Sequence, residues 1–140
     1  MKAVQFVTLT GISLLAMSSS CEKEAAVPSA PLATGRVVRI ETTIDDQGQR
    51  PRPRWEIDVS PLSFPGLSGG GSAGGTYQQV KAFDLPDTAT YKAGRLIQFH
   101  YQLVPPAQHT PWRTAYERYN MAPLMARGDQ LPELRLSDVR

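Results

Sequence analysis

The sequence predicts a mainly β domain, organised as a small antiparallel barrel or sandwich of about five strands with one short helix. Three observations lead to this fold class. Short segments between residues 36 and 140 carry the alternating apolar pattern of strands, turn residues separate them, and no helices alternate with them as in βαβ units. The chain of 140 residues also contains 11 glycines and 12 prolines, which favours short strands and loops over long helices.

Composition and charge place the chain among ordinary globular proteins with one modest domain. Hydrophobic residues make up 41% and charged residues 20% of the chain, and the formal net charge is +2. Because the charges are so nearly balanced, we expect neither a nucleic acid nor another polyanion as partner on this ground.

Residues 1–20 have the pattern of a secretory signal peptide. Lys2 provides a positive start, and an apolar run without any acidic residue follows it. The run has about the length of the hydrophobic region of such a signal and is too short to span a membrane comfortably. We therefore expect residues 1–20 to be a targeting segment that is removed from the mature protein.

Cys21, the only cysteine, directly follows small residues at the end of this segment. The junction "AMSSSCEKE" resembles the lipobox of bacterial lipoprotein precursors, with Ser19 and Ser20 before the cysteine and Ser18 where leucine is usual. The resemblance covers residues 1 to about 24. It implies a lipoprotein that is cut before Cys21, carries acyl chains such as palmitate there, and is held by membrane lipid in the cell envelope.

The cysteine count supports the same interpretation. Exported proteins normally carry cysteines in pairs, and a lone thiol calls for modification, intermolecular pairing or a reactive role. Each buried methylene contributes about 0.8 kcal/mol of membrane affinity, so two or three acyl chains on Cys21 would anchor the protein without a second signal. The charged residues after Cys21 also resemble signals that direct some lipoproteins to the outer membrane. A secreted protein with a free thiol is the alternative.

Residues 21–35 are predicted to hold the lipidated cysteine and a flexible linker. The segment is rich in alanine, proline and small polar residues and has no hydrophobic periodicity. Such a linker spans about 30–40 Å when extended. The globular domain is therefore expected at residues 36–140, a length sufficient to bury a core without disulfides.

Two strands are predicted at the start of the domain. Residues 36–45 and 54–60 alternate between apolar and polar side chains, and the stretch "DDQGQRPRP" between them supplies turn residues. The expected inward residues are Val38, Ile40, Thr42, Ile44, Trp55, Ile57 and Val59. The expected outward residues include Arg39, Glu41, Thr43, Asp45, Arg54, Glu56 and Asp58.

Residues 61–76 are predicted to form a long mobile loop, because glycine and serine make an ordered backbone costly. Within it, Gly69, Gly71 and Gly74 fit the G-x-G-x-x-G pattern of a phosphate-binding loop. That motif requires a helix directly after it, whereas the next residues have strand character. We therefore expect a flexible hairpin loop and no nucleotide site.

Three further strands are predicted within residues 77–86, 95–104 and 131–140. The first of these carries apolar residues in a pattern that indicates a bulge or burial on both faces, namely Val80, Ala82 and Phe83. The second alternates most strongly and ends at two prolines; its apolar face is Ile97, Phe99, Tyr101 and Leu103. The last offers Leu134, Leu136 and Val139 to the core.

One short helix is predicted over residues 110–120. Thr110 can cap this helix and Pro111 can occupy its first position. Its aromatic residues then lie on one face, which we expect to pack on an open end of the barrel; they are Trp112, Tyr116 and Tyr119. A surface that stacks on a ligand is the alternative.

The stretch "FDLPDTATYKAGRLIQFHYQL", residues 83–103, resembles the passage from the third to the fourth strand of small OB-like barrels in some exported bacterial lipoproteins. The resemblance implies an OB-like fold and carries no functional residues. An OB-fold has its helix between these two strands, whereas the helix predicted here follows the fourth strand. An immunoglobulin-like sandwich is therefore the alternative fold.

The sequence contains no recognisable catalytic or metal-binding motif. His100 and His109 have no nucleophile-elbow sequence near them, so neither an enzyme nor a cofactor is expected. Two histidines without cysteines or carboxylates at ligand spacing give no reason to expect a metal site. Asp45 and Asp46 fit an ordinary turn better than a calcium site.

The sequence favours a binding or assembly module of the cell envelope over an envelope enzyme. Small barrels bind ligands across one face or through the loops at a rim. The candidate binding residues combine aromatic and cationic side chains and would suit a glycan, a peptide or an anionic polymer: Trp55, Trp112, Arg113 and Tyr116, with Arg50, Arg52 and Arg54 nearby. An envelope protein is the other expected partner, and export argues against nucleic acid.

Overall fold

The computed structural model describes residues 29–68, 73–120 and 126–140. The predicted signal peptide, Cys21, Gly69 and Gly71 lie outside the described residues. Among the residues that are described, no helix is long and apolar enough to cross a membrane.

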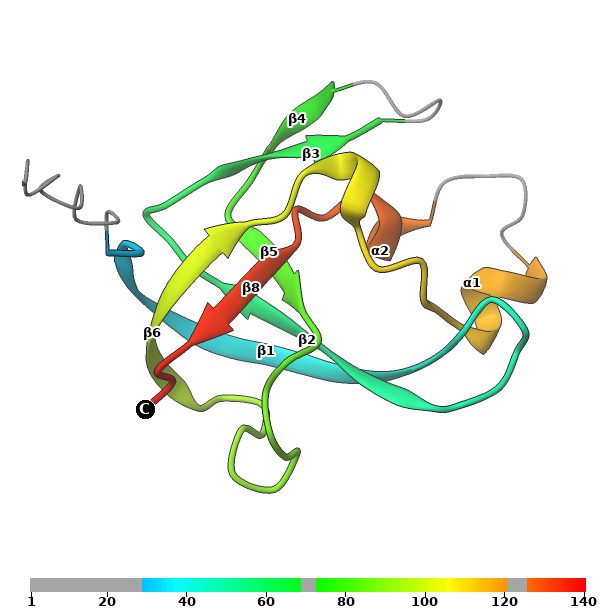
Figure 1. Cartoon of the computed structure of the whole chain (residues 1–140), viewed down its shortest axis with the longest axis horizontal. Helices are drawn as coiled ribbons and strands as arrows, with labels where there is room; N and C mark the ends of the chain where they lie inside the picture. Colours follow the sequence, from blue (N-terminus) through cyan, green and yellow to red (C-terminus); the bar gives the residue numbers. More distant parts are fainter. Residues whose placement is uncertain (1–28, 69–72, 121–125) are drawn as a thin grey trace, which may run out of the picture.

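The fold is mainly β and its paired strands run antiparallel, as the sequence predicts. The main sheet has the order β5-β2-β1-β6-β8, with β7 paired to β1, and a separate hairpin contains β3 and β4 (Figure 1). The strands are β1 (Leu32–Ile44), β2 (Arg52–Asp58), β3 (Phe64–Leu67), β4 (Ala73–Tyr77), β5 (Gln79–Ala82), β6 (Leu96–Leu103), β7 (Arg113–Thr114) and β8 (Leu134–Ser137). The helices are η1 (Pro106–Gln108), α1 (Ala115–Asn120) and α2 (Arg127–Gln130).

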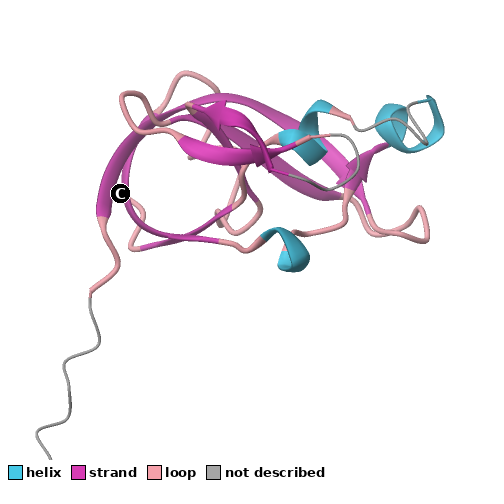
Figure 2. Ribbon diagram, turned by 90° about the horizontal axis from the view of Figure 1, so that it is seen from above, coloured by secondary structure: helices cyan, strands magenta, loops and turns pink. Residues whose placement is uncertain are grey.

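The hydrophobic core lies inside the curve of the main sheet, which Figure 2 shows from above. Its largest buried side chain is Trp55, and the predicted inward positions of β2, β6 and β8 add Ile57, Ile97, Phe99, Leu134 and Leu136. The core residues are Ala33, Val37, Trp55, Ile57, Val59, Val80, Ala82, Leu85, Ile97, Phe99, Leu134 and Leu136. The alternation pattern was therefore correct for most apolar positions of these three strands, whereas Leu103, also predicted to face inward, is 38% exposed.

The main sheet does not close into the predicted barrel through a continuous ladder. Its edge strands β5 and β8 meet through one parallel bridge between Lys81 and Glu133. The Lys81 N–H also donates to the Pro132 carbonyl oxygen at 2.9 Å, and the Leu136 N–H donates to Asp84 Oδ2 at 2.8 Å. These bonds satisfy backbone groups at a seam that lacks regular strand pairing.

The prediction of a long loop at residues 61–76 is wrong, because β3 and β4 form an antiparallel hairpin there. Phe64 anchors β3, because its ring makes an edge-to-face contact with Tyr101 at a centroid distance of 5.3 Å. Gly66 allows the two strands to approach, since a Cβ at that position would overlap the Tyr77 ring. Gly74 lies within β4, so no helix follows the glycine pattern there.

A β-bulge changes the predicted facing of the first strand. The register of β1 against β2 shifts between Val37 and Arg39, and Val37 rather than Val38 is buried. Val38 is 39% exposed, although the strict alternation placed it inward. Ile40 packs against the core as predicted, whereas Thr43, predicted to face outward, is fully buried beside β7. The strand also begins at Leu32, inside the segment predicted to be linker.

A second layer covers the outer face of β2 and β5. Arg54, Glu56 and Lys81 lie on this face and are only 1%, 1% and 3% exposed, so the prediction that Arg54 and Glu56 face solvent is wrong. The residues from η1 to β8, including α1 and α2, supply the covering side chains Glu117 and Glu133. The sheet therefore has an apolar inner layer and a charged outer layer.

The predicted helix at residues 110–120 is shorter than expected. Only Ala115–Asn120 is helical, because β7 occupies the preceding residues and pairs with β1. Trp112 lies before the helix, while Tyr116 and Tyr119 are 67% and 70% exposed. The expectation of an aromatic helix face packed on the domain is therefore wrong.

Candidate functional site

The predicted binding residue Trp55 is fully buried in the core and does not lie at a rim. Its indole Nε1–H donates to the Tyr91 carbonyl oxygen at 3.0 Å, which satisfies the polar atom of the buried ring. Trp55 therefore has a structural role in the core, and its assignment as a ligand-stacking residue is corrected.

Trp112 is half-buried in a contact between side chains of the domain. Its ring lies edge-to-face with Phe83 at a centroid distance of 5.6 Å, and the Arg52 guanidinium carbon lies 5.3 Å from the ring centroid. Tyr116 lies on the solvent side of α1 and lines a cavity of about 420 Å³ together with Arg39, Glu41 and Arg127. The structure thus separates these two aromatic residues from Trp55.

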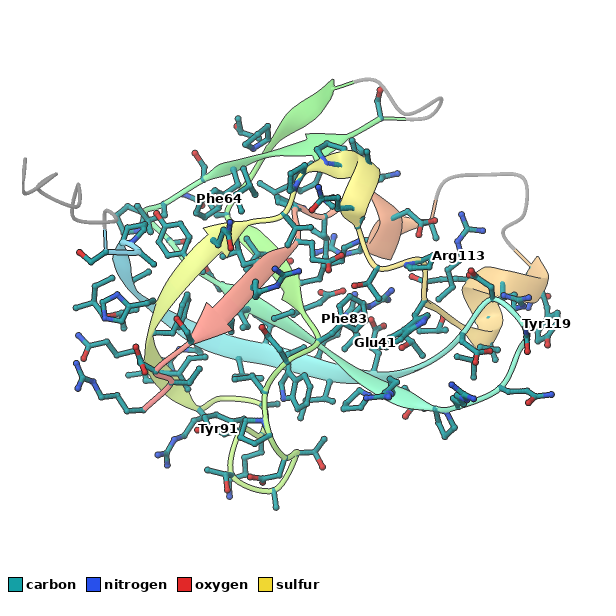
Figure 3. The ribbon with its side chains drawn as sticks, in the orientation of Figure 1. Glu41, Phe64, Phe83, Tyr91, Arg113 and Tyr119 are labelled. Atoms are coloured by element: carbon teal, nitrogen blue, oxygen red, sulfur yellow. The ribbon has the colours of Figure 1, made fainter. Side chains whose placement is uncertain are left out.

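Arg113 is the one predicted binding residue that lines a large cavity at the far end of the domain. We call this cavity the distal pocket. It has a volume of about 520 Å³ and is lined by Asp46, Pro111, Arg113, Arg118, Tyr119 and Asp129. Figure 3 shows Arg113 and Tyr119 at the α1 end of the molecule, whereas Figure 1 shows β1 beginning at the opposite end of the long axis.

The first wall of the distal pocket is the turn between β1 and β2. Asp45 Oδ1 accepts hydrogen bonds from the N–H groups of Gln47 and Gln49 at 3.0 and 2.8 Å, which closes the turn locally. Gly48 has φ +74°, and a Cβ there would lie 2.9 Å from the Tyr119 hydroxyl. The glycine therefore permits both the turn and the close position of Tyr119.

The second wall is α1, which a capping box fixes at its start. The Glu117 N–H donates to Thr114 Oγ1 at 3.1 Å, and the Thr114 N–H donates back to Glu117 Oε2 at 2.8 Å. Arg118 connects this helix to the first wall, because its Nη1 donates to the Asp45 carbonyl oxygen at 3.0 Å. These bonds thus fix the position of α1 against the β1–β2 turn.

Arg54 of β2 forms a buried ion pair with Glu117 of α1. Its Nη1 and Nη2 donate to the two Glu117 oxygens at 3.0 and 2.9 Å, and its Nε and Nη2 donate to Glu41 Oε2 at 3.2 and 2.6 Å. Burial acts to lower the pKa of Arg54, but the hydrogen bonds to Glu117 and Glu41 raise the pKa above its ordinary value. Burial likewise acts to raise the pKa of Glu117, and the bond from Arg54 lowers it overall.

Gly128 in α2 lies at the centre of this charged layer. Its N–H donates to Glu117 Oε1 at 3.3 Å, and its carbonyl oxygen accepts from Lys81 Nζ at 2.8 Å. A Cβ at this position would overlap the Arg54 guanidinium. Burial lowers the pKa of Lys81, although Glu133 and Asp129 act in the opposite direction.

The third wall of the distal pocket is an ion pair between β7 and α2. Arg113 Nε donates to Asp129 Oδ1 at 3.2 Å, and Arg113 Nη2 lies 2.7 Å from Asp129 Oδ2. This two-point geometry leaves further guanidinium N–H groups of Arg113 available for a ligand. Asp129 directly follows Gly128, so the charged layer also positions this wall.

The lining of the distal pocket balances donors and acceptors around one aromatic ring. Its two arginines and two aspartates have a formal net charge of zero, and Tyr119 supplies an exposed aromatic face. Such a lining suits an uncharged ligand with many hydroxyl groups better than a polyanion. Within residues 29–68, 73–120 and 126–140, no three His, Cys, Asp or Glu side chains are placed to hold a metal ion.

The two histidines lie outside the distal pocket. His100 Nδ1 is 2.7 Å from the Ala30 carbonyl oxygen, and His109 Nε2 is 3.2 Å from the Val104 carbonyl oxygen. Burial, followed by repulsion from Lys81, lowers the pKa of His109. Both imidazoles therefore contact backbone carbonyl groups of the domain.

Comparison with known proteins returns no match to a family model, a curated protein or a solved structure. The distal pocket contains Arg118 and Asp129, which the sequence did not single out for binding, and Tyr119, which the sequence offered only as part of an alternative ligand-stacking surface. One sequence signal could have located α1: Thr114 and Glu117 have the S/T-x-x-E spacing of a capping box.

Proposed function

We propose that this chain is a lipoprotein of a bacterial cell envelope, anchored through acylated Cys21, whose β domain is a non-catalytic binding or assembly module. The lipobox-like junction supports the anchor. The observation that supports the module is the distal pocket itself, which is lined by residues of α1 and its neighbours. Figure 1 shows α1 at the end of the long axis opposite the start of β1. Because the chain enters the domain at the start of β1, the linker would join the domain at the end opposite this pocket.

The strand arrangement supports an OB-like relationship as part of the same proposal. The order β5-β2-β1-β6-β8, with a parallel approach of β5 to β8, is compatible with a partly open five-stranded barrel. In such barrels, the loops between the first two and the last two strands bind ligands. The distal pocket is built from the β1–β2 turn and from the segment between β6 and β8.

The pairing of the buried ionisable groups supports a non-catalytic role. Arg54 uses its donors on Glu117 and Glu41, and Glu133 accepts from the backbone and hydroxyl of Thr110 at 2.7 and 2.6 Å. Because these side chains are bonded to partners within the domain, we assign them a structural role.

The anchor is tested by the intact mass of the full chain purified from the membranes of a bacterial host. We expect loss of residues 1–20 and a mass increase that corresponds to acyl chains on Cys21. The Cys21→Ala variant should keep the precursor mass and gain no acyl group. Ser18→Leu, which restores the leucine usual in the lipobox, is the matched control and should be acylated. Recovery of the wild-type chain with Met1 intact and the thiol unmodified would refute the proposal.

A further inference from the structure

We propose that the distal pocket binds an uncharged oligosaccharide. This inference rests on the proposed function, because it names the ligand class of a module presented in the envelope. Three features of the pocket carry it: an exposed aromatic ring, a preorganised arginine–aspartate pair and a balanced formal charge.

The aromatic ring belongs to Tyr119, which is 70% exposed although it lines the pocket. An exposed ring that nothing in the core requires is a surface on which the C–H face of a sugar ring can stack. The backbone that carries Tyr119 is fixed at the start of its helix by the cap at Thr114, and the Tyr119 hydroxyl lies near Gly48.

The polar groups of the pocket match hydroxyl groups, which both donate and accept hydrogen bonds. Arg113 and Asp129 are already fixed by their mutual contacts at 3.2 and 2.7 Å, and the guanidinium of Arg113 has further N–H groups that can donate to a ligand. Asp46 adds an exposed carboxylate on the opposite wall. A polyanion would gain from Arg118 but would meet two carboxylates, so the charge balance favours a neutral ligand.

The size of the pocket agrees with this ligand class. Its volume of about 520 Å³ falls within the range of small-molecule sites, which is roughly 300–1,000 Å³. Because the pocket is open to solvent and its lining residues are mostly polar, we expect weak binding.

The experiment is titration calorimetry on the full chain, purified from membranes in a detergent without a sugar headgroup. The probes are maltotetraose and chitotetraose, with tetragalacturonate as the acidic comparison. Trp112 fluorescence gives a second readout, because Trp112 precedes Arg113 whereas Trp55 is buried in the core. We expect at least one neutral probe to bind and tetragalacturonate to bind more weakly.

Two tyrosines of the same helix provide a matched pair of variants. Tyr119→Ala should weaken binding at least tenfold, and Tyr119→Phe should retain binding within about threefold because the ring is kept. Tyr116→Ala should bind like the wild type, since Tyr116 is equally exposed but lines a different cavity. Both positions are on the surface, so thermal unfolding should be unchanged in all three variants.

The inference is overturned if none of the three probes binds, if only tetragalacturonate binds, or if Tyr116→Ala weakens binding as much as Tyr119→Ala. The intact mass of the same preparation separates this failure from failure of the anchor. An acylated chain that binds no probe would contradict the oligosaccharide site alone. An unacylated chain that binds maltotetraose or chitotetraose would contradict the anchor alone.

Discussion

Replacement of Arg54 by methionine should destabilise the domain strongly, because Arg54 neutralises two carboxylates beneath α1. Arg54 is 1% exposed and Glu117 is 9% exposed, so water has little access to the Glu117 carboxylate once the guanidinium is lost. The Glu41 side chain is 25% exposed and can be solvated in part, so most of the cost falls on Glu117. Removing one partner of a buried ion pair costs about 3–5 kcal/mol. Methionine fills a similar length of side chain, which keeps the loss electrostatic rather than a matter of packing.

The expected loss is a large share of the total stability of a small domain, which is about 5–15 kcal/mol. With a urea m value of about 2 kcal/mol/M, the midpoint of unfolding should fall by roughly 1.5–2.5 M. Urea titrations followed by far-ultraviolet circular dichroism and by tryptophan fluorescence measure this shift. Trp55 makes the fluorescence a direct report on the core.

Two further variants separate the buried pair from a general effect of charge removal. Arg36→Met removes an exposed arginine that donates one hydrogen bond to the Gly94 carbonyl oxygen, and should cost less than about 1 kcal/mol. Arg54→Met combined with Glu117→Gln should cost less than the sum of the single variants, by about 1.5–3 kcal/mol. The reasoning is refuted if Arg54→Met shifts the midpoint no further than Arg36→Met does.

Three other substitutions test the packing at Gly128, the cap of α1 and the lowered pKa of His109. Gly128→Ala should destabilise the domain by about 1–3 kcal/mol in urea titrations, because its Cβ would overlap Arg54. Gly75→Ala is the control and should be nearly neutral, since there is open space around Gly75. Equal effects of the two substitutions would contradict this packing. Thr114→Ala should lower the free energy of unfolding by about 0.5–2 kcal/mol, and Thr114→Ser should retain most of the wild-type stability. A Thr114→Ala variant as stable as the wild type would show that the cap does not stabilise the domain. His109 has a lowered pKa in the fold, so the unfolded chain binds more protons just below pH 6.5 and stability should rise with pH there. His109→Gln should flatten this part of the stability–pH profile, and an unchanged profile would argue against the lowered pKa.

The sequence predicted the apolar layer well because local alternation determines it. Trp55 and Ile57 in β2, and Ile97 and Phe99 in β6, were expected to face inward and are buried. The prediction failed at Val38, because a β-bulge interrupts the alternation there and the sequence pattern does not indicate it. It also failed for β3 and β4, because pairing in a segment so rich in glycine depends on tertiary contacts such as the one from Phe64.

The charged layer and the distal pocket could not be predicted from local pattern. Arg54 and its partner Glu117 are 63 positions apart in the chain, and alternation alone places any arginine of a half-buried strand in solvent. The pocket joins a turn, a short helix and α2, which only the folded chain brings together. Arg113 was the one candidate binding residue that lies at this pocket. An arginine by itself suggests a binding role, but the sequence does not tell which residues surround it in the fold.

The buried charges account for the position of the distal pocket as well as for part of its stability. Arg54 fixes Glu117, Glu117 fixes the start of α1 and accepts from Gly128, and Asp129 follows Gly128 into contact with Arg113. An apolar layer of the same volume could stabilise the domain equally well, because desolvation offsets much of the gain from a buried ion pair. Apolar side chains would not orient two pocket walls through directional bonds, so the geometry at Tyr119 and Arg113 gives a physical reason for charge at these buried positions.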